Sequence, residues 1–135
     1  MNKKMLTNKN HIILDMDGTF YLGDRLLEGS LEFLDRVKAA GKQFLFFTNN
    51  SSRNKQVYLE KLANMNCFIE GGQLLTSGMV TINHVKNTWN NPKVYLLGTP
   101  DLEKDFESNG IELTEKNPDA VVVGFDTTLT YEKLE

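Results

Sequence analysis

The stretch HIILDMDGTFYLGD, residues 11–24, joins a short apolar run to two aspartates. Because the run is short and nearly continuous, residues 11–17 are predicted to form a buried strand. Asp15 and Asp17 end this strand, and Gly18 behind them permits a turn and close approach of a ligand to the backbone. Two carboxylates at the tip of one strand require a source of compensating charge.

The rest of the chain alternates between helical and strand patterns, and residues 71–78 are the only candidate boundary. Ser30 and Thr99 are the predicted N-caps of two helices, and Gly41 is placed to end the first of them. The periodicity predicts helices over 30–41, 54–65, 78–88 and 100–108, strands over 42–50, 93–98 and 120–125, and a helical turn after Thr130. This order predicts an α/β fold with a parallel sheet covered on both faces and right-handed crossovers.

Composition limits the classes of function. The 135 residues are 40% hydrophobic, which suffices for one domain or for parts of two small ones. The net charge is −3 and the basic residues are scattered, so we expect no nucleic-acid partner and no membrane partner. Cys67 is the single cysteine and is expected to be a buried hydrophobic residue in a reducing compartment, with the protein in the cytoplasm.

The polar ends of two predicted strands suggest one site. Asp15 and Asp17 follow the first strand, and Thr48 and Asn49 end the second. In parallel sheets, ligands bind outside the carboxyl ends of the strands, so these side chains are expected to face one crevice. Two close carboxylates without nearby His or Cys suit Mg²⁺. Thr48 and the amides after it suit a phosphoryl group, and a carboxylate whose charge a metal compensates can attack phosphorus.

These residues carry a resemblance to a known family. DMDGTFYLGD (15–24) resembles motif I of the haloacid dehalogenase (HAD) superfamily of phosphohydrolases, and FFTNNSSR (46–53) resembles motif II of its NagD-like, class IIA phosphatases. The stretches TSGMVT, VYLLGTPDL and DAVVVGFDTTLTYEKL are similar to later class IIA segments. The implied fold is a HAD-like Rossmannoid three-layer α/β/α core with a parallel sheet, in residues 1–77, followed by the start of an inserted α/β (C2-type) cap, in residues 78–135.

The resemblance also implies roles for individual residues. Asp15 would be the nucleophile and a Mg²⁺ ligand, and Asp17 the general acid/base with its backbone carbonyl on the metal. Thr48 and Asn49 would bind the transferring phosphoryl group, and Asn50 is a third candidate for phosphate binding. The segment Phe20–Glu28 would be a flap beside the site.

Two parts of the family pattern are missing from this sequence. The family needs a motif III lysine and a motif IV acidic pair, both of which follow the cap. Lys133, Asp119 and Asp126 belong to the cap-like region and are not expected to take these roles. The sequence therefore resembles the first half of a class IIA phosphatase, and the isolated chain is expected to be poorly active. Exposed strand edges would favour association.

The leading hypothesis is a Mg²⁺-dependent phosphatase that hydrolyses a small phosphorylated metabolite through an aspartyl-phosphate. Sugar phosphates, phosphoglycolate and nucleoside monophosphates all fit, because specificity would reside largely in the cap. A cap-mediated homo-oligomer would agree with the resemblance. The alternatives are a non-catalytic phosphate- or metal-binding module and a receiver-like signalling domain. The receiver reading is weaker, because both carboxylates follow one strand.

Overall fold

The chain forms two compact units. A computed structural model describes residues 8–134. Of these residues, the first unit takes 8–48 and Leu59–Leu75, and the second takes Asn49–Tyr58 and 76–134. The expected boundary at residues 77 and 78 lies close to the third point at which the chain passes between the units, after Leu75. The assignment of Asn49–Tyr58 to the second unit was not expected from the sequence.

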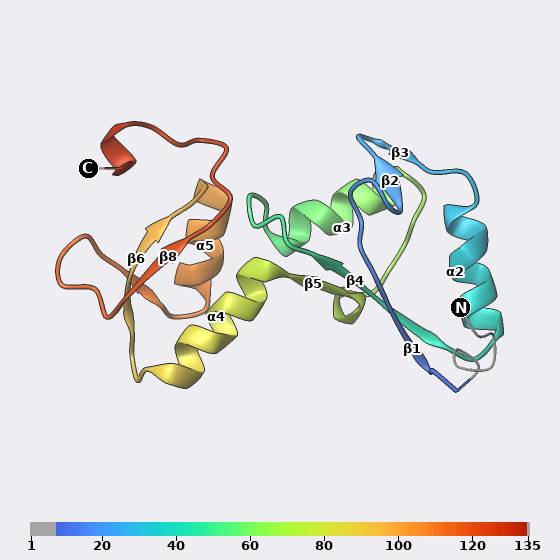
Figure 1. Ribbon diagram of the computed structural model, residues 1–135, viewed down its shortest axis with the longest axis horizontal. Coiled ribbons are helices and arrows are strands. Elements are labelled where there is room, and N and C mark those ends of the chain that lie inside the picture. Colours follow the sequence, from blue (N-terminus) through green and yellow to red (C-terminus); the bar gives the residue numbers. More distant parts are fainter. Residues whose placement is uncertain (1–7, 135) are drawn as a thin grey trace. The chain divides into compact units, whose positions relative to one another are not determined.

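The first unit is built on a three-stranded sheet with the order β1-β4-β5. β1 (His11–Leu14) pairs in parallel with β4 (Gln43–Thr48), and Leu14 lies opposite Phe46. Figure 1 shows these two strands side by side, with α2 (Ser30–Ala39) beside them. The remaining elements are the antiparallel pair β2 (Tyr21–Leu22) and β3 (Arg25–Leu26), α3 (Lys55–Asn64), which runs across the division, the 3-10 turn η1 (Gly71–Gln73) and β5 (Leu74–Thr76).

The core of the first unit is aromatic and lies against one side of β4. Phe44, Phe46 and Thr48 are buried at alternate positions of this strand. The rings of Phe20 and Phe46 meet edge to face, with centroids 4.7 Å apart. Cys67 is buried, as predicted, and this burial raises the pKa of its thiol against an opposing effect of Lys38.

Two predictions for the first unit are wrong in detail. The strand predicted over residues 11–17 ends at Leu14, and Ile13 is 69% exposed because β1 is an edge of the sheet with one side uncovered by the described residues. Ser30 is not an N-cap. Gly29, with a φ of 81°, occupies that position, and the Ser30 hydroxyl donates instead to the Phe20 carbonyl oxygen at 2.7 Å.

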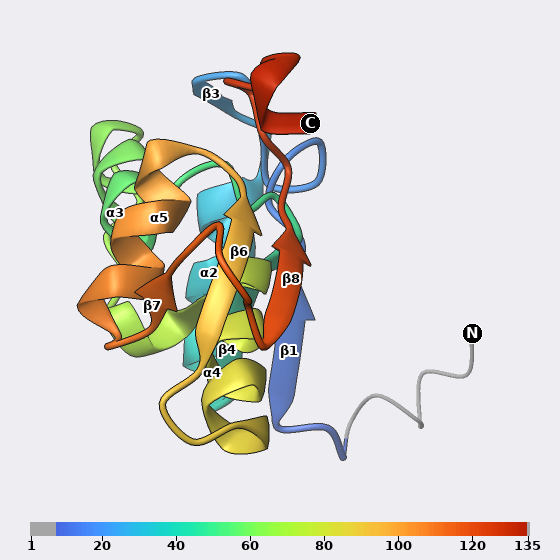
Figure 2. The same cartoon turned by 90° about the vertical axis from the view of Figure 1, so that its left-hand side faces the viewer.

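The second unit is built on a parallel sheet with the order β7-β6-β8. Its elements are α4 (Ser77–Thr88), β6 (Lys93–Leu97), α5 (Pro100–Ser108), β7 (Glu112–Leu113), β8 (Ala120–Val123) and the 3-10 turn η2 (Glu132–Leu134). Figure 2 shows β6 and β8 pointing the same way, with α5 beside them. The predicted cap of α5 is confirmed, because the Thr99 hydroxyl oxygen accepts the Leu102 N–H.

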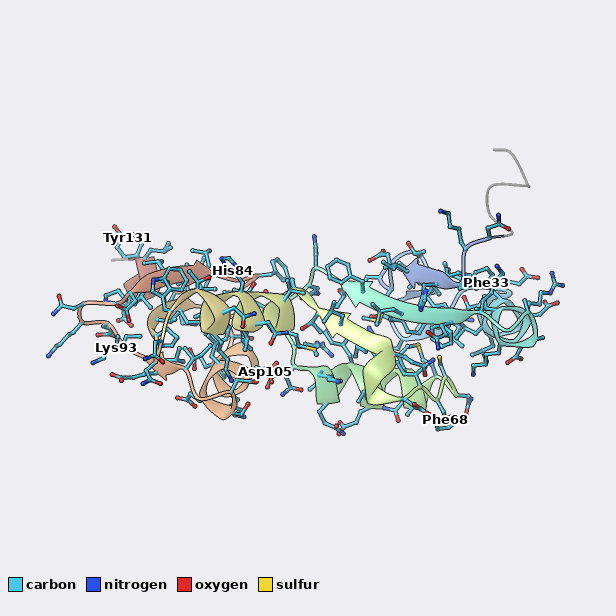
Figure 3. All side chains as sticks on the ribbon, turned by 90° about the horizontal axis from the view of Figure 1, so that it is seen from below. Phe33, Phe68, His84, Lys93, Asp105 and Tyr131 are labelled. Carbon is cyan, nitrogen blue, oxygen red and sulfur yellow. The ribbon has the colours of Figure 1, made fainter. Side chains whose placement is uncertain are left out.

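The exposed apolar side chains show that the sheets are not covered on both faces. In β8, Val121 is 64% exposed and Val123 is 70% exposed, while Val122 packs against the core of the unit. In the first unit Phe68 is 73% exposed and projects from the surface (Figure 3). Within the described residues, one face of β8 is therefore uncovered, while the parallel strands and helices agree with the predicted α/β class. Among these residues no helix has the length and apolar character needed to cross a membrane.

Leu102 is the best-fitted side chain of the second core. It is 2% exposed and packs with Ile82, Val94 and Phe106. Three glycines leave space for it, since a Cβ on any of them would lie within 2.7 to 2.9 Å of a Leu102 methyl carbon; they are Gly78, Gly98 and Gly124. The two methyl groups of Leu102 therefore occupy space that a side chain at any of these three positions would need.

Leu102→Ala should lower the free energy of unfolding by about 2–5 kcal/mol, because it removes a buried side chain whose neighbours are glycines that cannot fill the gap. Urea titration followed by circular dichroism measures this change. Leu129→Ala is the matched control, since Leu129 is 48% exposed, and its effect should stay within about 0.5 kcal/mol. Equal effects of the two substitutions would show that Leu102 is not a core anchor.

Candidate active site

The turn after β1 is organised around one backbone carbonyl. The Met16 carbonyl oxygen accepts N–H groups from Thr19 at 3.2 Å, Phe20 at 2.9 Å and Tyr21 at 3.2 Å. The Met16 side chain is fully buried, and Gly18 supplies the left-handed conformation with a φ of 78°. Anchoring the middle residue of the DMD sequence in this way leaves the residues on either side of it exposed.

These two exposed residues are Asp15 and Asp17. The Thr19 hydroxyl donates to Asp15 Oδ2 at 3.1 Å, and the Tyr21 hydroxyl donates to Asp17 Oδ2 at 3.2 Å. Within residues 8–134, no Lys, Arg or His nitrogen lies within 4.0 Å of either carboxylate. A neutral hydroxyl donor leaves the carboxylate charge uncompensated, so this turn suits a cation.

Tyr21 was not recognised as a site residue from the sequence. Its side chain is fully buried, and Lys61 Nζ lies 4.3 Å from the centroid of its ring. Lys61 Nζ also pairs with Asp24 Oδ1 at 3.7 Å. The ring is thus fixed on one side by packing and on another by a cation, and its hydroxyl is directed at Asp17. The Tyr21–Asp17 hydrogen bond forms within an irregular turn. Helical and strand periodicity give no information about contacts in such a turn.

The register of the sheet places the end of β4 at the same edge as this turn. Leu14 pairs with Phe46, so Asp15 follows the last pair and Thr48 is the last residue of β4. Thr48 is 2% exposed. The carboxyl ends of two neighbouring parallel strands, which is where α/β sheets bind ligands, therefore carry the carboxylates and this threonine.

Asn49 and Asn50 belong to the second unit, so the structure does not bring them together with Asp15 within one unit. Asn50 Oδ1 accepts hydrogen bonds from the Ser52 backbone N–H at 3.0 Å and from the Ser52 hydroxyl at 2.7 Å. Its carboxamide oxygen therefore closes a local turn. At the start of α3 the cap is Asn54, whose Oδ1 accepts the Val57 N–H at 3.0 Å.

A hollow of about 320 Å³ lies beside Asp15 in the first unit. Its walls are mainly apolar and come from the end of β1, the turn and the start of α2; they are formed by Leu14, Asp15, Thr19, Phe20, Leu27, Glu28, Gly29, Ser30 and Phe33. An apolar wall next to a carboxylate suits the non-reacting part of an organic substrate.

The donors for a metal are limited to the two carboxylates. The described part of the chain contains no group of three or more His, Cys, Asp or Glu residues able to hold a metal ion. Asp15 and Asp17 nevertheless fit a hard cation in their chemistry, because both are oxygen donors without a cationic partner among residues 8–134. A cation held there would take its other ligands from backbone oxygens, water or substrate.

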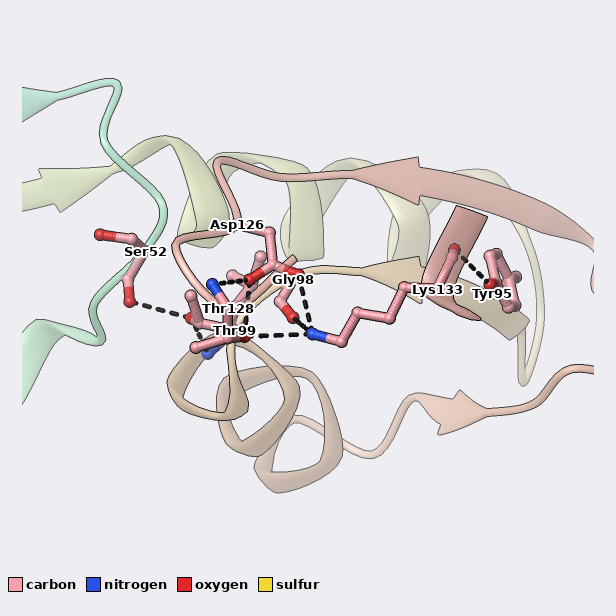
Figure 4. Close-up of polar contacts among 8 residues, drawn as sticks. Ser52, Tyr95, Gly98, Thr99, Asp126, Thr128 and Lys133 are labelled. Atoms are coloured by element: carbon pink, nitrogen blue, oxygen red, sulfur yellow. Dashed lines mark hydrogen bonds and ion pairs between the residues drawn. The ribbon is translucent and has the colours of Figure 1, made fainter. Parts of the chain in front are cut away.

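Lys133 donates hydrogen bonds to three groups of the second unit, as Figure 4 shows. Its Nζ lies 2.8 Å from Asp126 Oδ2, 3.0 Å from the Gly98 carbonyl oxygen and 3.1 Å from Thr128 Oγ1. The Asp126 side chain is 2% exposed. Burial by itself raises the pKa of Asp126, but hydrogen bonds from Lys133 and Thr128 outweigh burial and hold this pKa below its usual range. This lysine thus stabilises the second unit.

Lys133→Met should destabilise the protein in a pH-dependent way. Because the folded pKa of Asp126 is lowered, the ion pair stabilises the fold above the ordinary aspartate pKa of about 3.9, and this contribution is lost as the pH falls through the folded pKa. We expect a loss of about 1.5–3 kcal/mol at pH 7 that shrinks below about pH 4, measured by urea titration. Lys93→Met, which removes an exposed ion pair with Glu112, is the control. A loss independent of pH would contradict this assignment.

Comparison with known proteins identifies the class. The family model described as haloacid dehalogenase-like hydrolase matches residues 12–112. The 5'-nucleotidase YutF of Bacillus subtilis is 36% identical over 129 residues, which are 96% of this chain and 50% of that protein. The acid sugar phosphatase of Staphylococcus haemolyticus is 31% identical over 96% of this chain and 49% of that protein.

Solved structures agree with this assignment. The 4-nitrophenylphosphatase of Thermotoga maritima has a TM-score of 0.91 and 51% identity, over 96% of this chain and 49% of that chain. A glycerol phosphate phosphatase of Mycobacterium tuberculosis, solved in complex with magnesium, has a TM-score of 0.82 and 25% identity, over 93% of this chain and 39% of that chain.

The chain therefore belongs to the haloacid dehalogenase-like hydrolases. Within this family it is of the NagD-like, class IIA phosphatase type, with the α/β fold that the sequence predicted. The chain spans about half the length of the curated relatives it matches.

Proposed function

We propose that the protein hydrolyses a small phosphate monoester through an aspartyl-phosphate on Asp15, with Mg²⁺ as cofactor. The observation that carries the proposal is the pair of exposed carboxylates, Asp15 and Asp17, at the tip of a parallel strand without an ion-pairing partner among residues 8–134. Thr48 ends the neighbouring strand at the same edge. Membership of a hydrolase family supports the reaction class.

In the first step, an Asp15 carboxylate oxygen attacks phosphorus and the bond from phosphorus to the ester oxygen breaks. Thr19 assists by donating a hydrogen bond to Asp15 Oδ2, which orients the carboxylate and leaves its other oxygen for the attack. Asp17, in its protonated form, gives its proton to the leaving oxygen. In the second step, Asp17 takes a proton from water as that water attacks phosphorus and releases Asp15.

Tyr21 orients Asp17 in both steps. Its hydroxyl holds Asp17 Oδ2, so the other carboxylate oxygen is the one available for proton transfer. Because the tyrosine ring is fully buried, the position of its hydroxyl is set by the core of the first unit. Preorganisation of this kind lowers the cost of reaching the transition state.

Thr48, Asn49 and Asn50 are the proposed phosphoryl-binding residues. The hydroxyl of Thr48 and the backbone amides that follow it are donors of the kind that phosphoryl oxygens accept. Asn50 Oδ1 is committed to its turn, so Asn50 would contribute through donor groups.

Asp15 through its carboxylate and Asp17 through its backbone carbonyl oxygen would hold the Mg²⁺ ion. When bound, it would neutralise the charge that otherwise repels an anionic substrate and would polarise the phosphoryl oxygens. The magnesium complex of the Mycobacterium tuberculosis phosphatase supports this choice of metal.

We assign residues 1–77 to the catalytic core and residues 78–135 to the cap, with Asn49–Tyr58 as a core segment that the second unit holds. The named relatives act on a nucleotide, a sugar phosphate and nitrophenyl phosphate, which supports a small phosphorylated metabolite as substrate. A cytoplasmic location, which the single buried Cys67 favours, and a homo-oligomer stay predictions.

Asp15→Asn should abolish metal-dependent release of phosphate from p-nitrophenyl phosphate, because an amide cannot form the acyl-phosphate bond. The assay uses the native protein expressed from its complete reading frame, whose intact mass is determined first. Asp35→Asn is the matched control, since Asp35 is an exposed residue of α2 and lies outside the turn. Metal-dependent binding of phosphate without any turnover by the wild type would instead support a non-catalytic binding module.

Removal of magnesium with EDTA should stop turnover, and added Mg²⁺ should restore it, because the two carboxylates then regain their compensating charge. Full activity in EDTA would exclude the metal.

Asp17→Asn should lower kcat by about 10²–10⁴-fold, the usual contribution of general acid/base catalysis. An unchanged kcat in this variant would exclude the proposed role of Asp17.

A further inference from the structure

The segment Asn49–Ser52 is held by hydrogen bonds from several parts of the second unit. The Ser77 hydroxyl donates to the Asn49 carbonyl oxygen at 2.8 Å, and the Tyr58 hydroxyl donates to the Asn50 carbonyl oxygen at 3.0 Å. The Thr99 hydroxyl donates to the Ser52 carbonyl oxygen at 2.9 Å, as Figure 4 shows. Three of the four backbone carbonyls of this segment therefore have a hydroxyl donor.

Ser51 makes the contact that is most distant in sequence. Its hydroxyl oxygen accepts the Phe125 N–H at 2.8 Å across 74 residues, and Ser51 is only 7% exposed. β8 ends at Val123, and the Gly124 N–H still continues the sheet by donating to the Leu97 carbonyl oxygen at 2.8 Å. The Ser51 hydroxyl oxygen thus accepts the N–H that follows the last sheet hydrogen bond. Without Ser51 this N–H would have no partner in a neighbouring strand.

Gly124 permits this approach. A Cβ at Gly124 would lie 3.1 Å from Ser51 Oγ, tighter than ordinary van der Waals contact. The segment therefore packs directly against backbone at the carboxyl ends of β6 and β8. In open α/β sheets this edge is the usual place for a ligand. Here part of the chain itself, the segment Asn49–Ser52, occupies it.

Fixing these carbonyls also fixes the direction of the amides that follow them. None of the peptide bonds is cis. In a trans peptide the C=O and the next N–H point in opposite directions, so the donor to Asn49 sets the Asn50 N–H, and the donor to Asn50 sets the Ser51 N–H. These amides belong to the segment that carries the proposed phosphoryl-binding residues.

We infer that Ser51 and Ser77 are positioning residues for phosphoryl binding, through which the second unit sets the conformation of the Asn49–Ser52 segment. The inference rests on the proposed function, in which Asn49 and Asn50 bind the phosphoryl group. It adds to that function a dependence of phosphate affinity on the second unit, because the end of β8 and the start of α4 hold the segment. Neither serine touches the phosphoryl group in this assignment.

Ser51→Ala tests the inference in the native protein expressed from its complete reading frame. The inhibition constant of inorganic phosphate and the KM for p-nitrophenyl phosphate should each rise about tenfold, the size expected from losing one buried hydrogen bond. The pH profile of kcat should stay unchanged, because Asp15 and Asp17 are untouched. Ser51→Thr, which keeps the hydroxyl, should restore most of the affinity. Ser108→Ala is the matched control, since its hydroxyl bonds only within α5 to the Asp105 carbonyl oxygen.

A merely structural role predicts a different pattern. Loss of folded protein would lower the apparent kcat and leave KM and the phosphate inhibition constant at their wild-type values. That pattern, or constants within twofold of wild type and of Ser108→Ala, would overturn the inference. If Ser51→Ala does not fold, Ser77→Ala replaces it, because Ser77 is only half-buried and its donor bond is exposed. The same rise in both constants is then required.

Amide hydrogen exchange separates failure of this inference from failure of the proposed function. The Phe125 N–H should exchange slowly in the wild type and at least about tenfold faster in Ser51→Ala. A wild type without metal-dependent turnover or phosphate binding would refute the proposed function and with it any role in phosphoryl binding. Equal exchange rates of Phe125 in the two proteins would refute the attachment of the segment even if the enzyme is active.

Discussion

β1 and β4 pair in parallel with Leu14 opposite Phe46, and the candidate site depends on this register. A shift of one residue would turn Phe46 and Thr48 away from the core and would move the end of β4 relative to the turn at Asp15. The edge-to-face contact between Phe20 and Phe46 ties the turn segment to the same strand. Strand pairing and aromatic packing therefore act together to position the turn that carries the two carboxylates.

The turn itself shows how burial and exposure are divided within three residues. Met16 is fully buried and its carbonyl gathers three N–H groups, while the aspartates on both sides are exposed. Since the anchor lies between the two aspartates, their backbone cannot shift without disturbing the core. Both carboxylates are exposed and have no ionic partner among residues 8–134, so they are available to a cation.

Local sequence signals predicted the elements well where the deciding interactions are local. Thr99 caps α5, and Tyr58 and Leu62 of α3 are buried one turn apart, as the periodicity indicated. The short strands β5 and β7 were missed, because two or three residues carry no readable period. Ser30 was assigned to the wrong role because its partner, the Phe20 carbonyl, lies ten residues away.

The sequence by itself indicated the class of protein through the resemblance of DMDGTFYLGD and FFTNNSSR to family motifs, because such a resemblance depends only on residue type and order. It also determined most helices, whose capping and periodicity act within a few residues. Only the tertiary structure decided that Tyr21 holds Asp17 and that Ser51 meets the Phe125 N–H. The first contact depends on the shape of a turn, and the second joins residues 74 apart, so both arise only when the chain is folded.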